Sequence, residues 1–197
     1  MDVSTAVRER RSIRRFLRKK VPEAALAEMA QAARLAPTAN NRQPLRFVIA
    51  DEAALCARIF AHTRWAALAP EAGPDESTQP AAYIAILVDK TVRQQADADA
   101  GAAAMSMLLT AQAQGLASCW LGALEREPLL SLLRQDAARY ALHSLVALGY
   151  PAMRSRAVEA RRGETAYYLE EPDSLCVPKR AASDVIVWIG GETWSET

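Results

Sequence analysis

Four short apolar segments limit what this chain of 197 residues can fold into, because each is typical of a buried or half-buried strand. They are "LRFVIA" (45–50), "AAYIAILVD" (81–89), "LASCWLGAL" (116–124) and "LHSLVALGYP" (142–151). All are far shorter than the roughly 20 residues of a membrane-spanning helix. They do not alternate regularly with helices, as a doubly wound sheet would require. The pattern predicts one α+β domain over residues 1–197, with helices around about four strands.

Most of the chain between these predicted strands has apolar residues at the spacing of a helix. It predicts helices at 3–10, within "VPEAALAEMAQAARLAP" (21–37), at 52–60, from Asp97 or Asp99 to Gly115, and at 126–138. Proline-rich and polar stretches predict loops at 37–44 and 69–80. The stretch 152–176 has mixed charge and no clear period, which favours irregular structure. A last short element is expected at 179–190.

Composition narrows the class of protein. The formal net charge is +1, which argues against a dedicated nucleic-acid binder. Charged residues stand where a signal peptide would have its apolar core. The three cysteines are widely spaced without a CxxC pair, so we expect reduced thiols and no zinc or other metal site. These features together predict a soluble cytoplasmic protein.

Positive charge is nevertheless concentrated in "RERRSIRRFLRKK" (8–20), where eight of thirteen residues are Lys or Arg. Side chains alternate along an extended segment, so Arg10, Ser12 and Arg14 would point to one side. Forked guanidinium donors and a small hydroxyl suit a phosphate. Charge alone instead favours a solvated basic face or a nucleic-acid patch.

Three other segments carry weaker signals. The polar loop "PTANNRQP" (37–44) could present side-chain amides to a heterocycle, although an ordinary turn is the simpler interpretation. Gly122 after an apolar strand would let a flat ligand approach the backbone, although a core strand with a tight exit is again simpler. Cys119 is more typical of a buried inert thiol than of a nucleophile. Lys179 and Arg180 mean little alone, and no GxGxxG, P-loop, HExxH or GxSxG motif is present.

Taken together and in this order, the segments resemble the FMN-dependent nitroreductase family. "RRSIRRF" is similar to the family's opening Arg-Arg-Ser-x-Arg-x-Phe, and "APTANNRQPLRF" to its Ala-Pro-Ser-x-x-Asn-x-Gln-Pro-Trp-x-Phe segment. "GLASCWLGAL" is similar to its Gly-Leu-x-x-x-Trp-x-Gly strand, "LVALGYP" to a strand ending in Gly-Tyr-Pro, and "PKRAASDVIVW" more weakly to its closing basic pair. The resemblance implies an α+β fold with a central, mainly antiparallel sheet of about four to five strands flanked by helices. It also implies a homodimer with FMN at the interface.

The resemblance assigns residues to the two ends of the flavin. Arg10, Ser12 and Arg14 would hold its phosphate, with Arg11 at the same site and Lys179 or Arg180 reaching it from the far end of the chain. The partner chain would approach the flavin with Pro37, Thr38, Asn41 and Gln43. The ring would lie against Trp120, Leu121 and Gly122.

Three positions depart from the family pattern. Leu45 stands where a Trp is usual, Asn40 where a small residue is common, and Ala181 where a Pro often follows the basic pair. None of these removes an expected phosphate ligand. The first two bear on packing against the partner chain and on the shape of the substrate site, and the variable segments 60–80 and 152–176 would help form its mouth.

The implied function is reduction of nitroaromatics, quinones or a related small-molecule acceptor. FMN would accept hydride from NADH or NADPH and pass electrons to a second substrate bound in the same place, so no side chain needs to act as a catalytic residue. The alternatives are a specialised reaction such as dehalogenation or flavin breakdown, or a non-catalytic flavin-binding role. No nucleic acid or membrane is expected as a partner.

Overall fold

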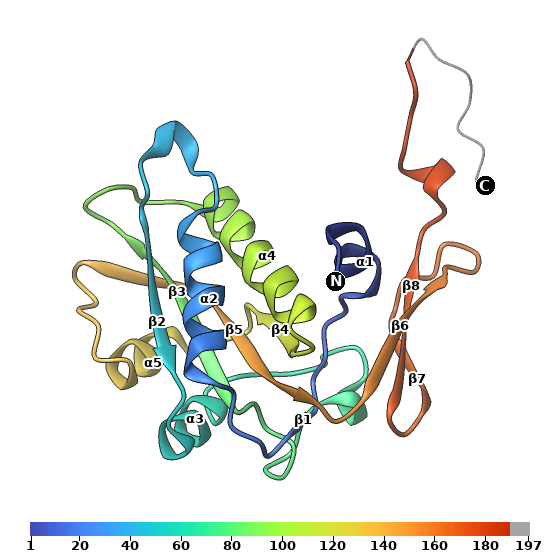
Figure 1. Cartoon of the computed structure of the whole chain (residues 1–197), viewed down its shortest axis with the longest axis horizontal. Coiled ribbons are helices and arrows are strands. Elements are labelled where there is room, and N and C mark those ends of the chain that lie inside the picture. The colour runs from blue at the N-terminus through green and yellow to red at the C-terminus, as the bar shows by residue number, and fades with distance from the viewer. Residues whose placement is uncertain (190–197) are drawn as a thin grey trace.

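The centre of the molecule is an antiparallel five-stranded sheet (Figure 1). The computed structural model describes residues 1–189. The central strand β5 pairs with β3 along one edge and with both β4 and β1 along the other, and β2 pairs with β3. The strands are β1 (Phe16–Leu17), β2 (Leu45–Ala50), β3 (Ala82–Asp89), β4 (Ala117–Leu121) and β5 (Tyr140–Pro151). The predicted α+β class with a mainly antiparallel sheet is therefore confirmed.

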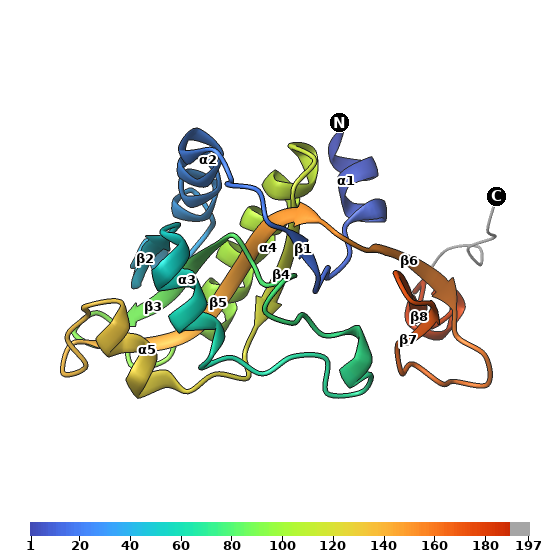
Figure 2. The ribbon, with the colours of Figure 1, turned by 90° about the horizontal axis from the view of Figure 1, so that it is seen from below.

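Helices cover both faces of this sheet, which explains the nearly unbroken apolar runs of β3 and β5. Every residue of β3 is buried. Residues of α2 (Glu23–Arg34) and α4 (Asp97–Ala113) form one apolar core with one face of the sheet. Residues of α3 (Ala53–Phe60) and α5 (Arg126–Leu132) form a second core with the opposite face. Figure 2 shows the two helix layers on either side of the strands.

The helix ends follow local chemistry that the sequence indicates. Asp2 caps α1 (Val3–Glu9) by accepting a hydrogen bond from the Thr5 amide at 3.0 Å. Gly115 follows α4 with a φ of 71°, a conformation that favours glycine. The predicted helix 126–138 is too long, because α5 ends at Leu132 and Arg134 takes a φ of 53°. The chain turns there, with the Gln135 amide donating to the Leu130 carbonyl.

The prediction of irregular structure over 152–176 is wrong. The stretch forms most of a second, three-stranded sheet of order β6-β8-β7, made of β6 (Arg154–Glu159), β7 (Tyr168–Glu171) and β8 (Ser174–Lys179). Charged residues in β6 and β7 hide the apolar alternation that normally indicates a strand, because two of these strands have mostly exposed or half-exposed side chains. Short 3-10 turns occur at Pro70–Ala72 and Ala182–Asp184, within the predicted loop 69–80 and the predicted element 179–190. The end of that element, residue 190, lies outside the described residues.

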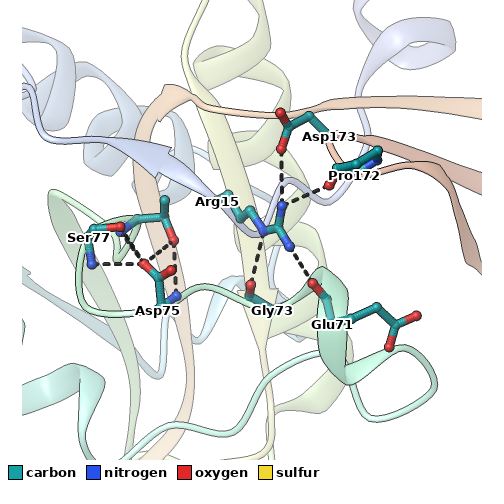
Figure 3. Close-up of polar contacts among 8 residues, drawn as sticks. Arg15, Glu71, Gly73, Asp75, Ser77, Pro172 and Asp173 are labelled. Carbon is teal, nitrogen blue, oxygen red and sulfur yellow. Dashed lines mark hydrogen bonds and ion pairs between the residues drawn. The ribbon is translucent and has the colours of Figure 1, made fainter.

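Arg15 ties the second sheet to the rest of the chain (Figure 3). Its guanidinium donates to the carbonyls of Gly73 at 3.2 Å and Pro172 at 2.8 Å, to the Asp173 carboxylate at 3.1 Å, and to the Glu71 carbonyl. A small apolar core lies beneath, formed by Ala66, Ala69, Ala72, Met153 and Leu175. One side chain thus joins the loop before β3, the start of β1 and the turn between β7 and β8.

Within residues 1–189, no helix combines the length and apolar content that crossing a membrane requires.

Candidate functional site

The basic segment after α1 lies along the start of β4. Arg10 leaves the helix with a φ of −56° and a ψ of 122°, and no helix or turn intervenes before β1. Ser12 forms a parallel bridge with Ser118, and the Ile13 amide donates to the Ser118 carbonyl at 3.0 Å. This pairing with β4 orients the segment, so that its side chains point alternately to the two faces of the sheet.

Arg10, Ser12 and Arg14 come together around the Cys119 thiol. Burial raises the pKa of Cys119 to about 11, and Arg14, the Ser12 hydroxyl and Arg10 each act in the opposite direction. A shared effect on one thiol agrees with three side chains at alternate positions that lie on one side of the segment. The sequence predicted this grouping from alternation alone.

This cluster carries donors that the folded chain leaves without a partner. Among the described residues, Arg14 Nη1 and, nearby in the chain, Arg11 Nε are buried and make no hydrogen bond. Ser118 Oγ is also unpaired, but it lies on the opposite face of β4 from Cys119, because side chains alternate along a strand. Arg14 also lies over the Tyr167 ring, 4.4 Å from its centroid, and Arg10 is half-buried with its pKa lowered by burial and by Arg11. Buried cations and unpaired donors are unfavourable unless an anion binds them. The donor set therefore fits a phosphate group.

Arg11 lies apart from this cluster. Its guanidinium turns back and donates to the carbonyls of Arg8 and Arg10, at the C-terminal end of α1. Arg11 and Ile13 line a cavity of about 630 Å³ between α4, the end of β5 and the second sheet. The structure thus separates Arg11 from the three residues with which the resemblance groups it.

The end of β4 offers a surface for a flat ligand. Trp120 is 42% exposed, while the Leu121 side chain is buried in the core, so only the backbone of Leu121 faces outward from the strand. Around Gly122, no atom lies within 4 Å of where a Cβ would stand. Ser118 and Gly122 are four residues apart, about 13 Å along a strand. A ligand held at Ser12 by one end could extend along β4 to Gly122.

Trp120 borders a cavity of about 600 Å³ with residues that the sequence did not single out. The Trp120 indole donates to Ser144 Oγ at 2.8 Å, and its ring is stacked on His143 with centroids 6.4 Å apart. Arg126 donates to the carbonyls of Gly122 and His143. These residues come from separate segments with no shared motif, so only the folded chain brings them together.

The loop predicted at 37–44 has an unusual backbone. Asn40, Asn41 and Gln43 have φ values of 54°, 51° and 49°, in the left-handed region that few residues other than glycine adopt. Thr38 Oγ1 accepts the Gln43 amide at 3.0 Å and holds the loop closed. Such strain is often retained at binding sites.

This loop lies at the start of α4, whereas Arg11, the neighbour of Arg10 and Ser12 in the chain, lies toward its end. The amide of Ala39 donates to Asp99 in the first turn of α4, whereas Arg11 shares a cavity with Gln112 near its end. Asp99 and Gln112 are thirteen residues apart, about 20 Å along a helix. In Figure 1 the loop lies above α2, away from α1. Pro37, Thr38, Asn41 and Gln43 therefore do not meet the arginine cluster of their own chain.

Lys179 and Arg180 are not joined to the cluster either. Lys179 ends β8 opposite Glu159, and Arg180 donates to the Asp184 carbonyl at 3.0 Å. Within residues 1–189, no hydrogen bond or ion pair links these two cations to Arg10, Ser12 or Arg14.

The fold is that of an α+β protein, with Arg10, Ser12 and Arg14 grouped at the edge of an antiparallel sheet. The model of the nitroreductase family matches residues 7–150, so the chain belongs to the nitroreductase family.

Solved structures agree with the family. A protein assigned as a nitroreductase from Desulfovibrio desulfuricans, in complex with FMN, is 30% identical with a TM-score of 0.67, over 87% of this chain and 98% of that one. A structure from Bacteroides thetaiotaomicron is 21% identical with a TM-score of 0.68, over 86% of this chain and 97% of that one, and shows the same fold. Among curated relatives, an Archaeoglobus fulgidus protein assigned as NADH dehydrogenase/NAD(P)H nitroreductase is 28% identical over 148 residues, covering 72% of this chain and 81% of the relative.

Proposed function

We propose that the protein is an FMN-dependent NAD(P)H oxidoreductase that reduces nitroaromatics, quinones or a related small acceptor. The observation that carries this proposal is the group formed by Arg10, Ser12 and Arg14 beside the start of β4, with Arg14 Nη1 buried and unpaired. Membership of the nitroreductase family and the FMN complex of the Desulfovibrio relative support it.

In this proposal the chain binds and orients the cofactor, and FMN supplies the hydride and electron transfer when bound. Arg10, Ser12 and Arg14 hold the phosphate with charge-assisted hydrogen bonds. The backbone at Leu121 and Gly122 and the face of Trp120 support the ring. NADH or NADPH and the acceptor use the same open face in turn, so no side chain needs to act as acid or base.

A homodimer completes the proposed site. The resemblance places Pro37, Thr38, Asn41 and Gln43 of a second copy at the flavin. In their own chain these loop residues lie at the start of α4, about 20 Å along the helix from Gln112, which shares a cavity with Arg11. An exposed apolar run supports association. The residues from Val185 to Ile189 are all apolar, and each is between 46% and 97% exposed. Roles for Lys179 and Arg180 at the phosphate stay predictions. Arg11 would bind the phosphate only if its guanidinium left the carbonyls of Arg8 and Arg10.

An absorption spectrum of the purified protein, before and after anaerobic addition of NADH or NADPH, tests the proposal. We expect flavin bands that bleach with at least one nicotinamide. Bands that persist with both would favour a specialised flavin reaction or a non-catalytic role. A protein that takes up no FMN on incubation would refute the proposal.

A further inference from the structure

A chain of hydrogen bonds links three separate segments beside Trp120. The Trp120 indole donates to Ser144 Oγ at 2.8 Å, and Ser144 Oγ lies 2.9 Å from His143 Nδ1. His143 Nε2 lies 3.2 Å from Asp97 Oδ1, at the start of α4. The His143 ring is also stacked against the Trp120 ring, with an interplanar angle of 21°.

The donor and the acceptor in each of these hydrogen bonds follow from the groups at the two ends of the network, the Trp120 indole and the Asp97 carboxylate. An indole N–H can only donate and a carboxylate can only accept. With a neutral imidazole, Nε2–H donates to Asp97 and Nδ1 accepts the Ser144 hydroxyl proton, while the hydroxyl oxygen accepts from Trp120. All three contacts are then satisfied at once, including that of Ser144, which is only 2% exposed.

Protonation of His143 breaks this consistency. Nδ1–H would become a second donor to Ser144 Oγ beside Trp120, and the buried Ser144 hydroxyl proton would lose its acceptor in the network. An unsatisfied buried donor is costly. The charged groups that line the cavity around His143 are Asp97 from α4 and Arg126 from α5. Asp97 is 81% exposed, so water screens much of its attraction for an imidazolium.

We propose that His143 is a positioning residue whose protonation state sets the orientation of the Trp120 ring and thereby couples ligand binding at the end of β4 to pH. The part of this inference that concerns FMN rests on the proposed function. The neutral imidazole favours the arrangement in which the indole is held by Ser144. Histidine in general changes charge between about pH 5 and 8. A charged imidazole turns the Ser144 hydroxyl proton away from Nδ1, which disturbs the group that holds the indole and weakens binding of a flat ring against Trp120.

The indole N–H resonance of Trp120 tests the network without any cofactor. Spectra of ¹⁵N-labelled protein, with this resonance assigned from Trp120→Phe, are recorded from about pH 8 to 5. We expect the chemical shift of this resonance to change with pH in the wild type and to stay constant in His143→Gln and His143→Phe. The second variant keeps a flat ring against Trp120 but has no nitrogen to titrate.

The other histidine provides a matched control. His62 also pairs with a carboxylate, with its Nδ1 2.8 Å from Glu125 Oε2, yet it does not stack on Trp120. His62→Gln should therefore keep the wild-type titration of the Trp120 resonance. The proposed network is overturned if the chemical shift of the Trp120 indole does not change with pH in the wild type. It is also overturned if the shift changes with pH in His143→Gln as it does in the wild type.

FMN affinity provides the second readout. The phosphate of FMN itself titrates near pH 6, so the informative quantity is the change in Kd between about pH 8 and 5.5 in the wild type relative to His143→Gln. We expect the wild type to lose about fivefold more affinity than the variant on acidification. Equal losses would overturn the coupling to the flavin. Failure to bind FMN at either pH would refute the proposed function and the flavin part of this inference, while the indole titration would still decide the network.

Discussion

Arg10 and Arg14 are the side chains on which the proposed function depends most directly. Replacing either with alanine removes a charge-assisted hydrogen bond to the phosphate, so we expect FMN binding to weaken by about 1.5–3 kcal/mol, roughly ten- to 150-fold in Kd. Titration of FMN fluorescence measures this change. Arg8→Ala is the matched control, because it removes the same charge from the exposed surface of α1. Wild-type affinity in both Arg10→Ala and Arg14→Ala would contradict the phosphate assignment.

Asp89 stabilises the end of β3 through a carboxylate that must stay charged. Arg139 donates to it at 2.9 and 2.7 Å, and hydrogen bonds from Arg139 and Thr91 lower its pKa to about 2. Because the folded-state pKa is below the usual 3.8, the carboxylate adds stability above about pH 4 and loses it as the pH falls toward 2.

We therefore expect Asp89→Asn to lower the urea midpoint at neutral pH, with the difference from the wild type shrinking below pH 4. Urea unfolding monitored by circular dichroism at several pH values measures it. Glu76→Gln, at an exposed loop position, provides the control for loss of one carboxylate. A difference that stays constant down to the lowest pH would show that charge is not the cause.

At the scale of elements, the second sheet depends on Arg15. Its hydrogen bonds reach the turn between β7 and β8 and the loop at 71–73 (Figure 3). Arg15→Ala leaves three carbonyls without this donor, so we expect a loss of about 2 kcal/mol or more in local stability. Hydrogen exchange over residues 154–179 should speed up, while exchange in β3 changes less. Arg18→Ala, an exposed neighbour, should leave both regions unchanged.

The sequence patterns were sufficient to predict elements whose bounds depend on local chemistry. The segment 45–50 forms β2 with the predicted bounds, and α4 begins at Asp97 and is followed by a left-handed Gly115, because periodicity and caps act locally. The second sheet was missed because its strands carry charges that pair with one another, such as Arg156 with Glu170 at 2.7 Å. Such pairs form across strands and leave no apolar alternation in the sequence.

At the scale of the whole molecule, the proposed homodimer makes a prediction about mixed subunits. Arg14→Ala damages the phosphate end of a site, and Asn41→Gly removes the loop amide while keeping its φ of 51° accessible. If each site uses Arg14 of one chain and Asn41 of the other, a mixed dimer contains one intact site. Refolding the two variants together should therefore restore about a quarter of the sites, from random pairing.

FMN binding in the mixture measures this recovery, and each variant refolded alone is the control. Native mass spectrometry shows whether mixed dimers have formed. Mixed dimers without recovered FMN binding would place Arg14 and Asn41 in the same site of one chain or show that one of them is not involved.

The sequence alone determined the features that arise within a few residues. It determined the main strands and helices, the loop at 37–44, and the alternation that brings Arg10, Ser12 and Arg14 to one side. The tertiary structure alone decided which distant segments meet. It brought Asp97, His143 and Ser144 to Trp120, and it placed the loop and Arg11 toward opposite ends of α4. Spacing along a chain fixes neighbours on one helix face or strand face, whereas contacts between segments depend on how whole elements pack.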